Sequence, residues 1–341
     1  MNIYGMHLSQ EDVLRKTGRI RQVFGSRRYI LNQGAAKGTE CVDVNCGEFA
    51  FTIVPDRGMD ISLASYRGCN LAFQAAPGEV NPAYYDGCGS GSSNSFFAGL
   101  LTTCGLDNLS RPCADEGVNL GQHGRYSGIP AEVFNDLSRW EDGRYIMEFR
   151  GVVTQPLLLS HKLRLTRTIS AVAGETRLFI ADEIENFGSI RSPLMILYHV
   201  NAGFPLLDEG ADIACSPHDA RGYDEYSQER IAAMYEVSQP KPGFPEENFL
   251  LKMNTDKAYA KIMNKRLMNG ISLYVNWESC ELPYMTLWRS FQYSDYVMAA
   301  EPCNCPCRSR SLQRAEGTLP FIEPGEIKRF HLEIGVTAAQ S

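Results

Sequence analysis

The sequence of 341 residues lacks the motifs that mark several large enzyme classes. It has no Gly-x-Gly-x-x-Gly stretch and no phosphate-binding loop ending in Lys-Ser or Lys-Thr, which excludes the common nucleotide fingerprints. It also has no Gly-x-Ser-x-Gly elbow, the mark of a serine hydrolase of the α/β type. Strand patterns do not alternate with helix patterns, so a doubly wound parallel sheet is not expected either.

Long apolar runs and runs of basic residues are missing as well. No segment approaches the ~20 apolar residues that a membrane-spanning helix needs. The first residues, Met1 to His7, contain no basic region followed by an apolar stretch, which argues against a signal peptide. The net charge of −7 argues against a nucleic-acid surface. We therefore expect a cytoplasmic protein that binds neither membranes nor nucleic acid.

Period-two alternation of apolar and polar residues dominates the chain. Clear examples are residues 49–53, 145–149, 271–277 and 330–336. Each is typical of a strand with one buried face. Such strands recur from about residue 40 onward and are separated by Gly, Pro, Asn and Asp turns, which favours a large antiparallel β-sandwich.

Signals for helices are few. Ser9 to Asp12 resembles a capping box, and the apolar residues after it are followed by a stop at Gly18. Residues 227–237 are compatible with a second short helix, and the Gly/Ser-rich residues 87–93 predict a loop.

Three short segments place proton-transfer groups beside turn residues. They are Gln-His-Gly-Arg around His123, Tyr-His-Val-Asn-Ala-Gly around His199 and Ala-Glu-Pro around Glu301. Histidine titrates near neutrality, and a carboxylate at an apolar strand end can be tuned toward it, so the set can move protons between oxygens. Residue types alone leave plainer interpretations open: a buried histidine bonded to a carbonyl, an ordinary polar loop and a surface glutamate.

These motifs, in this order, resemble the aldose 1-epimerase (galactose mutarotase-like) superfamily, and more closely its DUF4432 branch. The segments that resemble it are residues 55–61 (PDRGMDI), 99–106 (GLLTTCGL), 123–125 (HGR), 197–201 (LYHVN) and 301–302 (EP). The resemblance implies an all-β fold, a galactose mutarotase-like β-supersandwich of two large antiparallel sheets with few short helices and a sugar cleft on one side. Residues 1–40 are then interpreted as an N-terminal extension packed on a main domain of residues 41–341.

The resemblance also implies roles for single residues. The family's histidine at this place is the general acid toward the ring oxygen of a sugar, a role carried to His199. Its C-terminal glutamate is the base on the anomeric hydroxyl, a role carried to Glu301. His123, Arg125 and Asn201 are expected to bind the sugar. The other candidate sugar-binding residues are Arg57, Asp60, Trp288 and Arg289.

Several of these candidates have equally good structural explanations. Arg57 and Asp60 flank a tight turn that an Arg–Asp pair would fix, and Trp288 is also a normal core residue. This branch departs from typical mutarotases here, because their substrate-binding arginine lies in a different motif and their substrate-binding aspartate has no clear counterpart.

Eleven cysteines are present, and an odd number cannot all pair. In a cytoplasmic protein we expect them to be reduced. Cys303, Cys305 and Cys307 are separated by single residues, whereas zinc-binding pairs are usually separated by two or more, and no second cysteine pair follows. We therefore expect no metal, and we interpret the cluster as part of the rim of the site near Glu301.

The implied function is an aldose 1-epimerase-like isomerase that opens and recloses a sugar ring by acid–base transfer, without metal or nucleotide cofactor. Two alternatives stay open: another proton-shuttling sugar isomerase or epimerase, and a non-catalytic carbohydrate-binding protein. The expected partner is a small unphosphorylated or acidic sugar, and a homodimer formed through an exposed sheet edge is compatible with the sequence.

Overall fold

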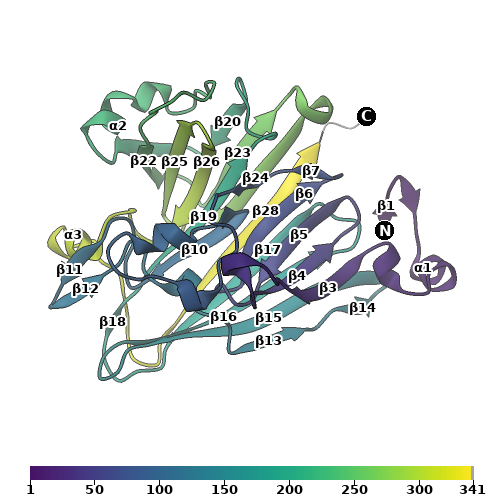
Figure 1. Cartoon of the computed structure of the whole chain (residues 1–341), viewed down its shortest axis with the longest axis horizontal. Coiled ribbons are helices and arrows are strands. Elements are labelled where there is room, and N and C mark those ends of the chain that lie inside the picture. Colours follow the sequence, from purple (N-terminus) through teal and green to yellow (C-terminus); the bar gives the residue numbers. More distant parts are fainter. Residues whose placement is uncertain (339–341) are drawn as a thin grey trace.

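Two large antiparallel sheets form the body of the protein in the computed structural model, which describes residues 1–338 (Figure 1). The larger sheet has eleven strands and the smaller has nine. The prediction of an all-β fold built from two large antiparallel sheets is confirmed. The period-two alternation explains this fold, because it gives each sheet one apolar face that packs into a shared core.

The eleven-stranded sheet contains most of the residues singled out in the sequence. In spatial order its strands are β21 (His218–Gly222), β22 (Glu247–Met253), β25 (Tyr284–Gln292), β26 (Asp295–Cys303), β19 (Met195–Gly203), β10 (Leu101–Leu106), β6 (Asp60–Tyr66), β5 (Phe49–Val54), β4 (Glu40–Asn45) and β3 (Gly25–Ile30), with β7 (Cys69–Asn70) paired to β6. Part of the predicted N-terminal extension is thus the edge strand β3 of this sheet.

The nine-stranded sheet covers the other side of the core. Its strands, in spatial order, are β13 (Val133–Asp136), β15 (Arg144–Pro156), β16 (Lys162–Val172), β17 (Arg177–Asn186), β28 (Ile327–Ala338), β24 (Ile271–Glu278), β23 (Lys257–Asn264) and β20 (Asp212–Cys215), with β14 (Arg139–Glu141) paired to β15. Burial alternates along β16 and β17 residue by residue, as predicted for strands with one exposed face.

Helices are short and peripheral. Within residues 1–338 the α-helices are α1 (Gln10–Lys16), α2 (Glu225–Glu229) and α3 (Arg310–Ala315). The predicted capping box begins α1, because Ser9 Oγ accepts from the Asp12 N–H and Asp12 accepts from the Ser9 N–H, each at 3.0 Å. The second helix begins two residues earlier than predicted, because Asp224 is its N-cap. No helix in the described part of the chain is long and apolar enough to cross a membrane.

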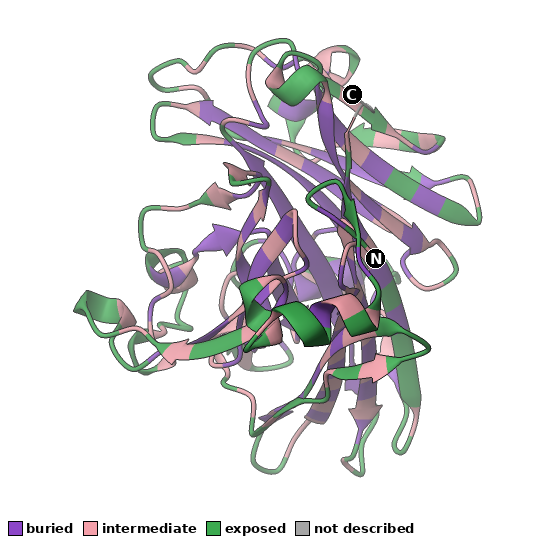
Figure 2. Ribbon diagram, turned by 90° about the vertical axis from the view of Figure 1, so that its right-hand side faces the viewer, coloured by how far each residue is buried: buried purple, intermediate pink, exposed green. Residues whose placement is uncertain are grey.

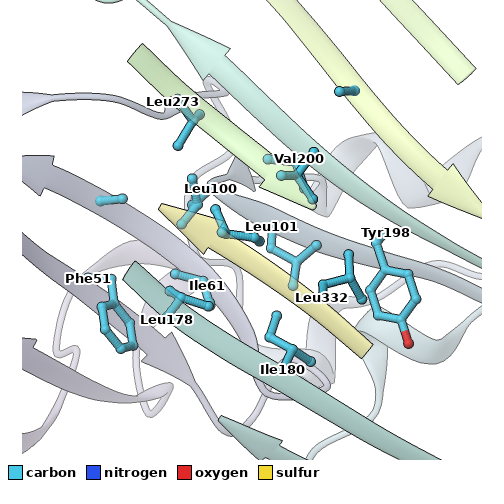
Figure 3. Close-up of a cluster of buried hydrophobic side chains, with 14 of the residues drawn as sticks. Phe51, Ile61, Leu100, Leu101, Leu178, Ile180, Tyr198, Val200, Leu273 and Leu332 are labelled. Carbon is cyan, nitrogen blue, oxygen red and sulfur yellow. The ribbon is translucent and has the colours of Figure 1, made fainter. Parts of the chain in front are cut away.

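The core lies between the sheets. Ile61 and Val200 from the larger sheet pack in one cluster with Leu178, Ile180 and Leu332 from the smaller one (Figure 3). Figure 2 shows buried residues concentrated along the strands and exposed ones at turns and helices. Each fully buried aliphatic side chain of this kind contributes roughly 1.5–3 kcal/mol, which explains why the alternation in the sequence predicts the fold.

A buried ion network also joins the two sheets. Arg167 on β16 donates to both carboxylate oxygens of Asp182 at 2.9 and 2.7 Å, and to Asp60 Oδ1 on β6 at 3.2 Å. The Tyr198 hydroxyl on β19 donates to Asp182 at 2.7 Å. Arg167, Asp182 and Asp60 are completely buried. Burial raises the pKa of Asp60 to about 6, although the charge of Arg167 acts in the opposite direction.

Candidate active site

One row of polar side chains crosses four strands of the larger sheet. Thr102 on β10 lies opposite His199 on β19, and Glu301 on β26 lies opposite Thr286 on β25. The register between β19 and β26 places His199 opposite Glu301. Because partners in an antiparallel pair point to the same face, all four side chains share one face. Alternate residues such as Val200 point into the core, so this row lies on the other face of the sheet.

A cavity of about 550 Å³ opens over this row. Its size is within the range usual for small-molecule sites. The wall contains aromatic and polar groups from several elements, among them Phe96, Gln122, Tyr223, Glu246, Asn248 and Trp288. A concave site with apolar walls and a few convergent polar groups is the usual form of a ligand pocket.

Glu301 and His199 face each other at the bottom of the cavity. Glu301 Oε1 lies 3.0 Å from His199 Nε2, and the two residues are 2% and 5% exposed. The separation is that of a hydrogen bond, but the alignment is not, and Glu301 Oε1 has no hydrogen-bond partner. Catalytic hydrogen bonds are often poorly aligned until substrate binds.

Burial favours the neutral form of both groups of this pair. Desolvation lowers the pKa of His199 to about 3, and the nearby His123 lowers it further. Desolvation raises the pKa of Glu301 well above its usual range, and the charge of Glu246 adds to this effect. Both shifts act against an ion pair and favour a carboxylic acid beside an uncharged imidazole. Titratable groups displaced in this way are typical of catalytic sites.

Aromatic rings enclose the imidazole of His199. The rings of Phe96 and Trp288 each lie edge-on to it with centroids 5.3 Å away. The Trp288 Nε1–H donates to Glu246 at 3.2 Å, which fixes the indole at the cavity wall. These rings keep water from the imidazole and offer an apolar surface to a ligand.

His123 reaches the cavity because a strained turn holds it there. His123 has φ +56°, Gly124 has φ +67°, and Gly105 of β10 donates its N–H to the His123 carbonyl at 2.8 Å. A Cβ on Gly124 would lie 2.3 Å from the Gly105 oxygen, so only glycine allows this approach. The Ser110 N–H points at His123 Nδ1 from 3.4 Å, which leaves Nε2–H as the donor side of the ring.

Arg57 lines the cavity, but its guanidinium is occupied. It donates to the carbonyls of Ser127 at 2.6 Å, Val80 at 2.8 Å and Ser95 at 2.9 Å. These three carbonyls belong to separate loops that form the cavity wall. Arg57 therefore has a structural role, because few of its donors remain for a ligand. Its partners are these carbonyls, and not Asp60 as the alternative interpretation of the turn expected.

Four other predicted sugar-binding residues do not line this cavity. Arg125 follows His123 in the same turn but points to the other side, where it donates to the Pro156 carbonyl at 3.1 Å. Asp60 belongs to the ion network between the sheets. Asn201 is completely buried behind His199.

Arg289 is the fourth of these residues. It pairs with buried Glu247 and donates to the carbonyls of Ala233, Met234 and Glu236 at 2.9, 3.0 and 2.7 Å. It therefore ties the segment after α2 to the sheet, while its neighbour Trp288 points into the cavity. Among the predicted residues, the structure brings Glu301, His199, His123, Trp288 and Arg57 together.

Sequence reasoning missed several cavity residues. Phe96, Tyr223 and Glu246 lie on loops without a recognisable motif, and Gln122 lies in the His123 motif but was not assigned a role. Asn248 could have been predicted from Trp288, because the two residues lie directly opposite each other in the β22–β25 register and share one face of the sheet. That register depends on strand pairing, which the sequence alone does not specify.

The cysteine cluster lies directly beneath the site. Cys303, Cys305 and Cys307 are buried and pack with Cys104 and several leucines. Cys307 and Cys104 line the cavity. Burial raises the pKa of all four thiols, so they behave as small apolar residues. Within residues 1–338, no group of three or more His, Cys, Asp or Glu side chains is arranged to hold a metal ion.

Comparison with known proteins agrees with the fold. Residues 36–336 match the family model described as a domain of unknown function, DUF4432. No curated protein sequence matches the chain. The structure is similar to that of a "putative aldose 1-epimerase" from Klebsiella pneumoniae, with TM-score 0.83 and 19% identity over 92% of this chain and 88% of that one. It is also similar to a galactose mutarotase-like protein from Clostridium acetobutylicum, with TM-score 0.64 and 12% identity over 93% and 99% of the two chains.

At these identities the structural likeness concerns the fold, whereas the family match covers most of the sequence. Both agree with the motifs found in the sequence, so the resemblance stated above is confirmed. The chain belongs to the DUF4432 family and has the galactose mutarotase-like fold.

Proposed function

We propose that this protein is an aldose 1-epimerase-like isomerase that interconverts the anomers of a sugar. The observation that supports this most directly is the opposed pair of Glu301 and His199, 3.0 Å apart and almost completely buried at the bottom of a cavity. Mutarotation needs one group that takes a proton and one that gives a proton, and this pair supplies both. The similar structures are described as a "putative aldose 1-epimerase" and a "galactose mutarotase-like protein", which agrees with this choice.

The proposed reaction is a reversible ring opening. Glu301, as carboxylate, takes the proton of the anomeric hydroxyl, the C1–O5 bond breaks, and His199, as imidazolium, gives a proton to O5. The aldehyde end rotates, and the same transfers in reverse close the ring on the other face. The pair ends the cycle with the proton it started with, so the protein is regenerated without a cofactor.

The state of the pair favours chemistry over binding alone. A site that only binds a sugar would gain by pairing its buried polar atoms within the protein, because unpaired ones are costly. Here Glu301 Oε1 is buried without a partner in the protein. Strained or unsatisfied groups of this kind are concentrated at functional sites.

The charges of the cavity favour an uncharged sugar. Within the described chain, the arginines that line it are Arg57, which is bonded to three carbonyls, and Arg111, which is exposed and lies over the Tyr223 ring. Glu246 and Asp295 also line the cavity. A carboxylated or phosphorylated sugar would meet these carboxylates, so we narrow the expected partner to a neutral aldose.

Anomer exchange measured by saturation-transfer NMR tests the proposal. The panel should contain neutral aldoses and the corresponding uronic acids, with deuterated water used in parallel. We expect the protein to accelerate exchange of at least one neutral aldose, and to act less on its acid. Deuterium incorporation at C2 would show another isomerase, and binding without acceleration would show a carbohydrate-binding protein.

Two neighbouring substitutions test which side of the His123 turn faces the sugar. His123→Ala removes a donor from the cavity and should weaken sugar binding by roughly 0.5–1.5 kcal/mol, the usual net value of one hydrogen bond. Arg125→Ala is the matched control, because it lies in the same turn but points away, and it should leave affinity unchanged. Calorimetric titration measures both. A larger loss for Arg125→Ala would place the sugar outside the cavity.

A further inference from the structure

Two buried polar atoms without partners lie behind the candidate acid–base pair. They are His199 Nδ1 and Asn201 Oδ1. His199 and Asn201 are two residues apart on β19, so their side chains share one face of the strand. No hydrogen bond joins these two atoms in the structure, although both side chains lie on this face of β19.

The orientation of the Asn201 amide is fixed by its nitrogen. Nδ2 donates to the Ala98 carbonyl at 3.1 Å and to the His199 carbonyl at 2.8 Å. Both of its N–H groups are used, and a flipped amide would place Oδ1 against two carbonyl oxygens. Asn201 therefore presents only an acceptor to the histidine ring.

The other neighbours of the ring do not compete for Nδ1. Phe96 and Trp288 contact it with aromatic edges, and the His123 ring centroid lies 6.1 Å away. Glu301 is on the Nε2 side. On this face of β19 the orphan oxygen of Asn201 is a buried acceptor without a partner, and one hydrogen bond from Nδ1–H would satisfy both atoms.

We propose that Asn201 is a positioning residue that holds His199 as the Nδ1–H tautomer, so that Nε2 is bare toward the cavity and the proton of the pair is on Glu301 in the free protein. The resting arrangement is then the reverse of the one that ring opening needs. His199 is an acceptor at Nε2, and Glu301 is a carboxylic acid.

The catalytic consequence rests on the proposed function. Before Glu301 can act as a base, its proton must move to His199. In that step the O–H bond of Glu301 breaks, the Nε2–H bond of His199 forms, and a carboxylate and an imidazolium result. The 3.0 Å between Oε1 and Nε2 allows the transfer. Sugar hydroxyls that donate to the Glu301 carboxylate favour the ion pair formed by this proton transfer. Asn201 Oδ1 stabilises the His199 imidazolium by accepting from Nδ1–H.

The tautomer can be measured in the free protein, without any sugar. Nitrogen-15 NMR of histidine-labelled protein at neutral pH reports which ring nitrogen carries the proton, and His199→Gln identifies the signal by its loss. We expect Nδ1 of His199 to be protonated and Nε2 to be bare. An Nε2–H tautomer, or an imidazolium in the free protein at neutral pH, would overturn the proposal.

Two variants locate the cause of the tautomer. Asn201→Leu removes the acceptor, and we expect the Nδ1–H population to fall. Anomer exchange should fall about 10–100-fold, by analogy with the loss of a hydrogen-bond partner of a metal-bound histidine, while sugar affinity changes little. Thr102→Val is the control, because Thr102 lies opposite His199 on β10 but bonds to the Ala98 carbonyl at 2.8 Å. In Thr102→Val, His199 should have the same tautomer as in the wild type.

The spectrum of the wild type decides the proposal even if Asn201→Leu does not fold. An unchanged tautomer in folded Asn201→Leu would contradict the role of Asn201. A wild type that has the expected tautomer but accelerates no sugar would remove the proposed function and leave the tautomer assignment intact, so the two failures are distinguishable.

Discussion

Glu301→Gln should lower the rate of anomer exchange by about 10²–10⁴-fold, the usual contribution of a positioned acid or base. The substitution keeps the size of the side chain and its hydrogen-bonding atoms. An amide, however, can neither take nor give the transferred proton at neutral pH. Sugar affinity should stay close to that of the wild type, because the cavity keeps its shape. Saturation-transfer NMR gives the exchange rate, and calorimetric titration gives the affinity.

Two further variants sharpen this test. Glu246→Gln removes the other carboxylate near the pair without touching the transferred proton, so its effect should be much smaller than that of Glu301→Gln. The double variant Glu301→Gln with His199→Asn should lose less than the product of the single losses, since the two groups act as a unit. If Glu301→Gln exchanges the sugar as fast as the wild type, Glu301 is not part of the chemistry.

Arg167→Met should lower the free energy of unfolding by about 3–5 kcal/mol, the usual cost of removing one partner from a buried ion pair. Without Arg167, the carboxylates of Asp182 and Asp60 stay buried with no cation between the sheets. Urea unfolding measures this loss as a lower midpoint with an unchanged slope.

The same strand offers a matched control. Arg164 also lies on β16 and pairs with Glu185 at 2.5 Å, but both side chains are partly exposed, 43% and 33%. Exposed pairs contribute about 0–1 kcal/mol, so Arg164→Met should change stability little. Replacing Arg167, Asp182 and Asp60 together by apolar residues should restore much of the loss. Equal losses for Arg164→Met and Arg167→Met would refute the assignment of stability to the network.

The sequence predicted the fold well because the alternation recurs in many strands, among them β16 and β17. A residue such as Ile180 or Leu332 is buried because of its place in the alternation, and many such positions agree with one another. The prediction of the pair His199 and Glu301 rested on motifs, and strand register explains why the two motifs meet. That register joins strands about a hundred residues apart, which local patterns cannot show.

The predicted binding residues are harder to place from sequence, because the type of a residue does not show in which direction its side chain points. Arg57 and Arg289 have the donors that a sugar site needs, but each uses them on carbonyls of neighbouring loops. His123 and Arg125 are two residues apart in one turn and point to different cavities. Glu246 and Phe96 carry no motif at all, and only the folded loops bring them to the site.

The strand order has a consequence for how the protein is made. β28 lies between β17 and β24 in the nine-stranded sheet, although it follows every other strand along the described chain. During synthesis the facing edges of β17 and β24 therefore stay unpaired until residues 327–338 leave the ribosome. Unpaired edges of this kind are prone to pair with other chains. Ribosome-bound chains that stop before residue 327 should aggregate more readily than chains that include β28.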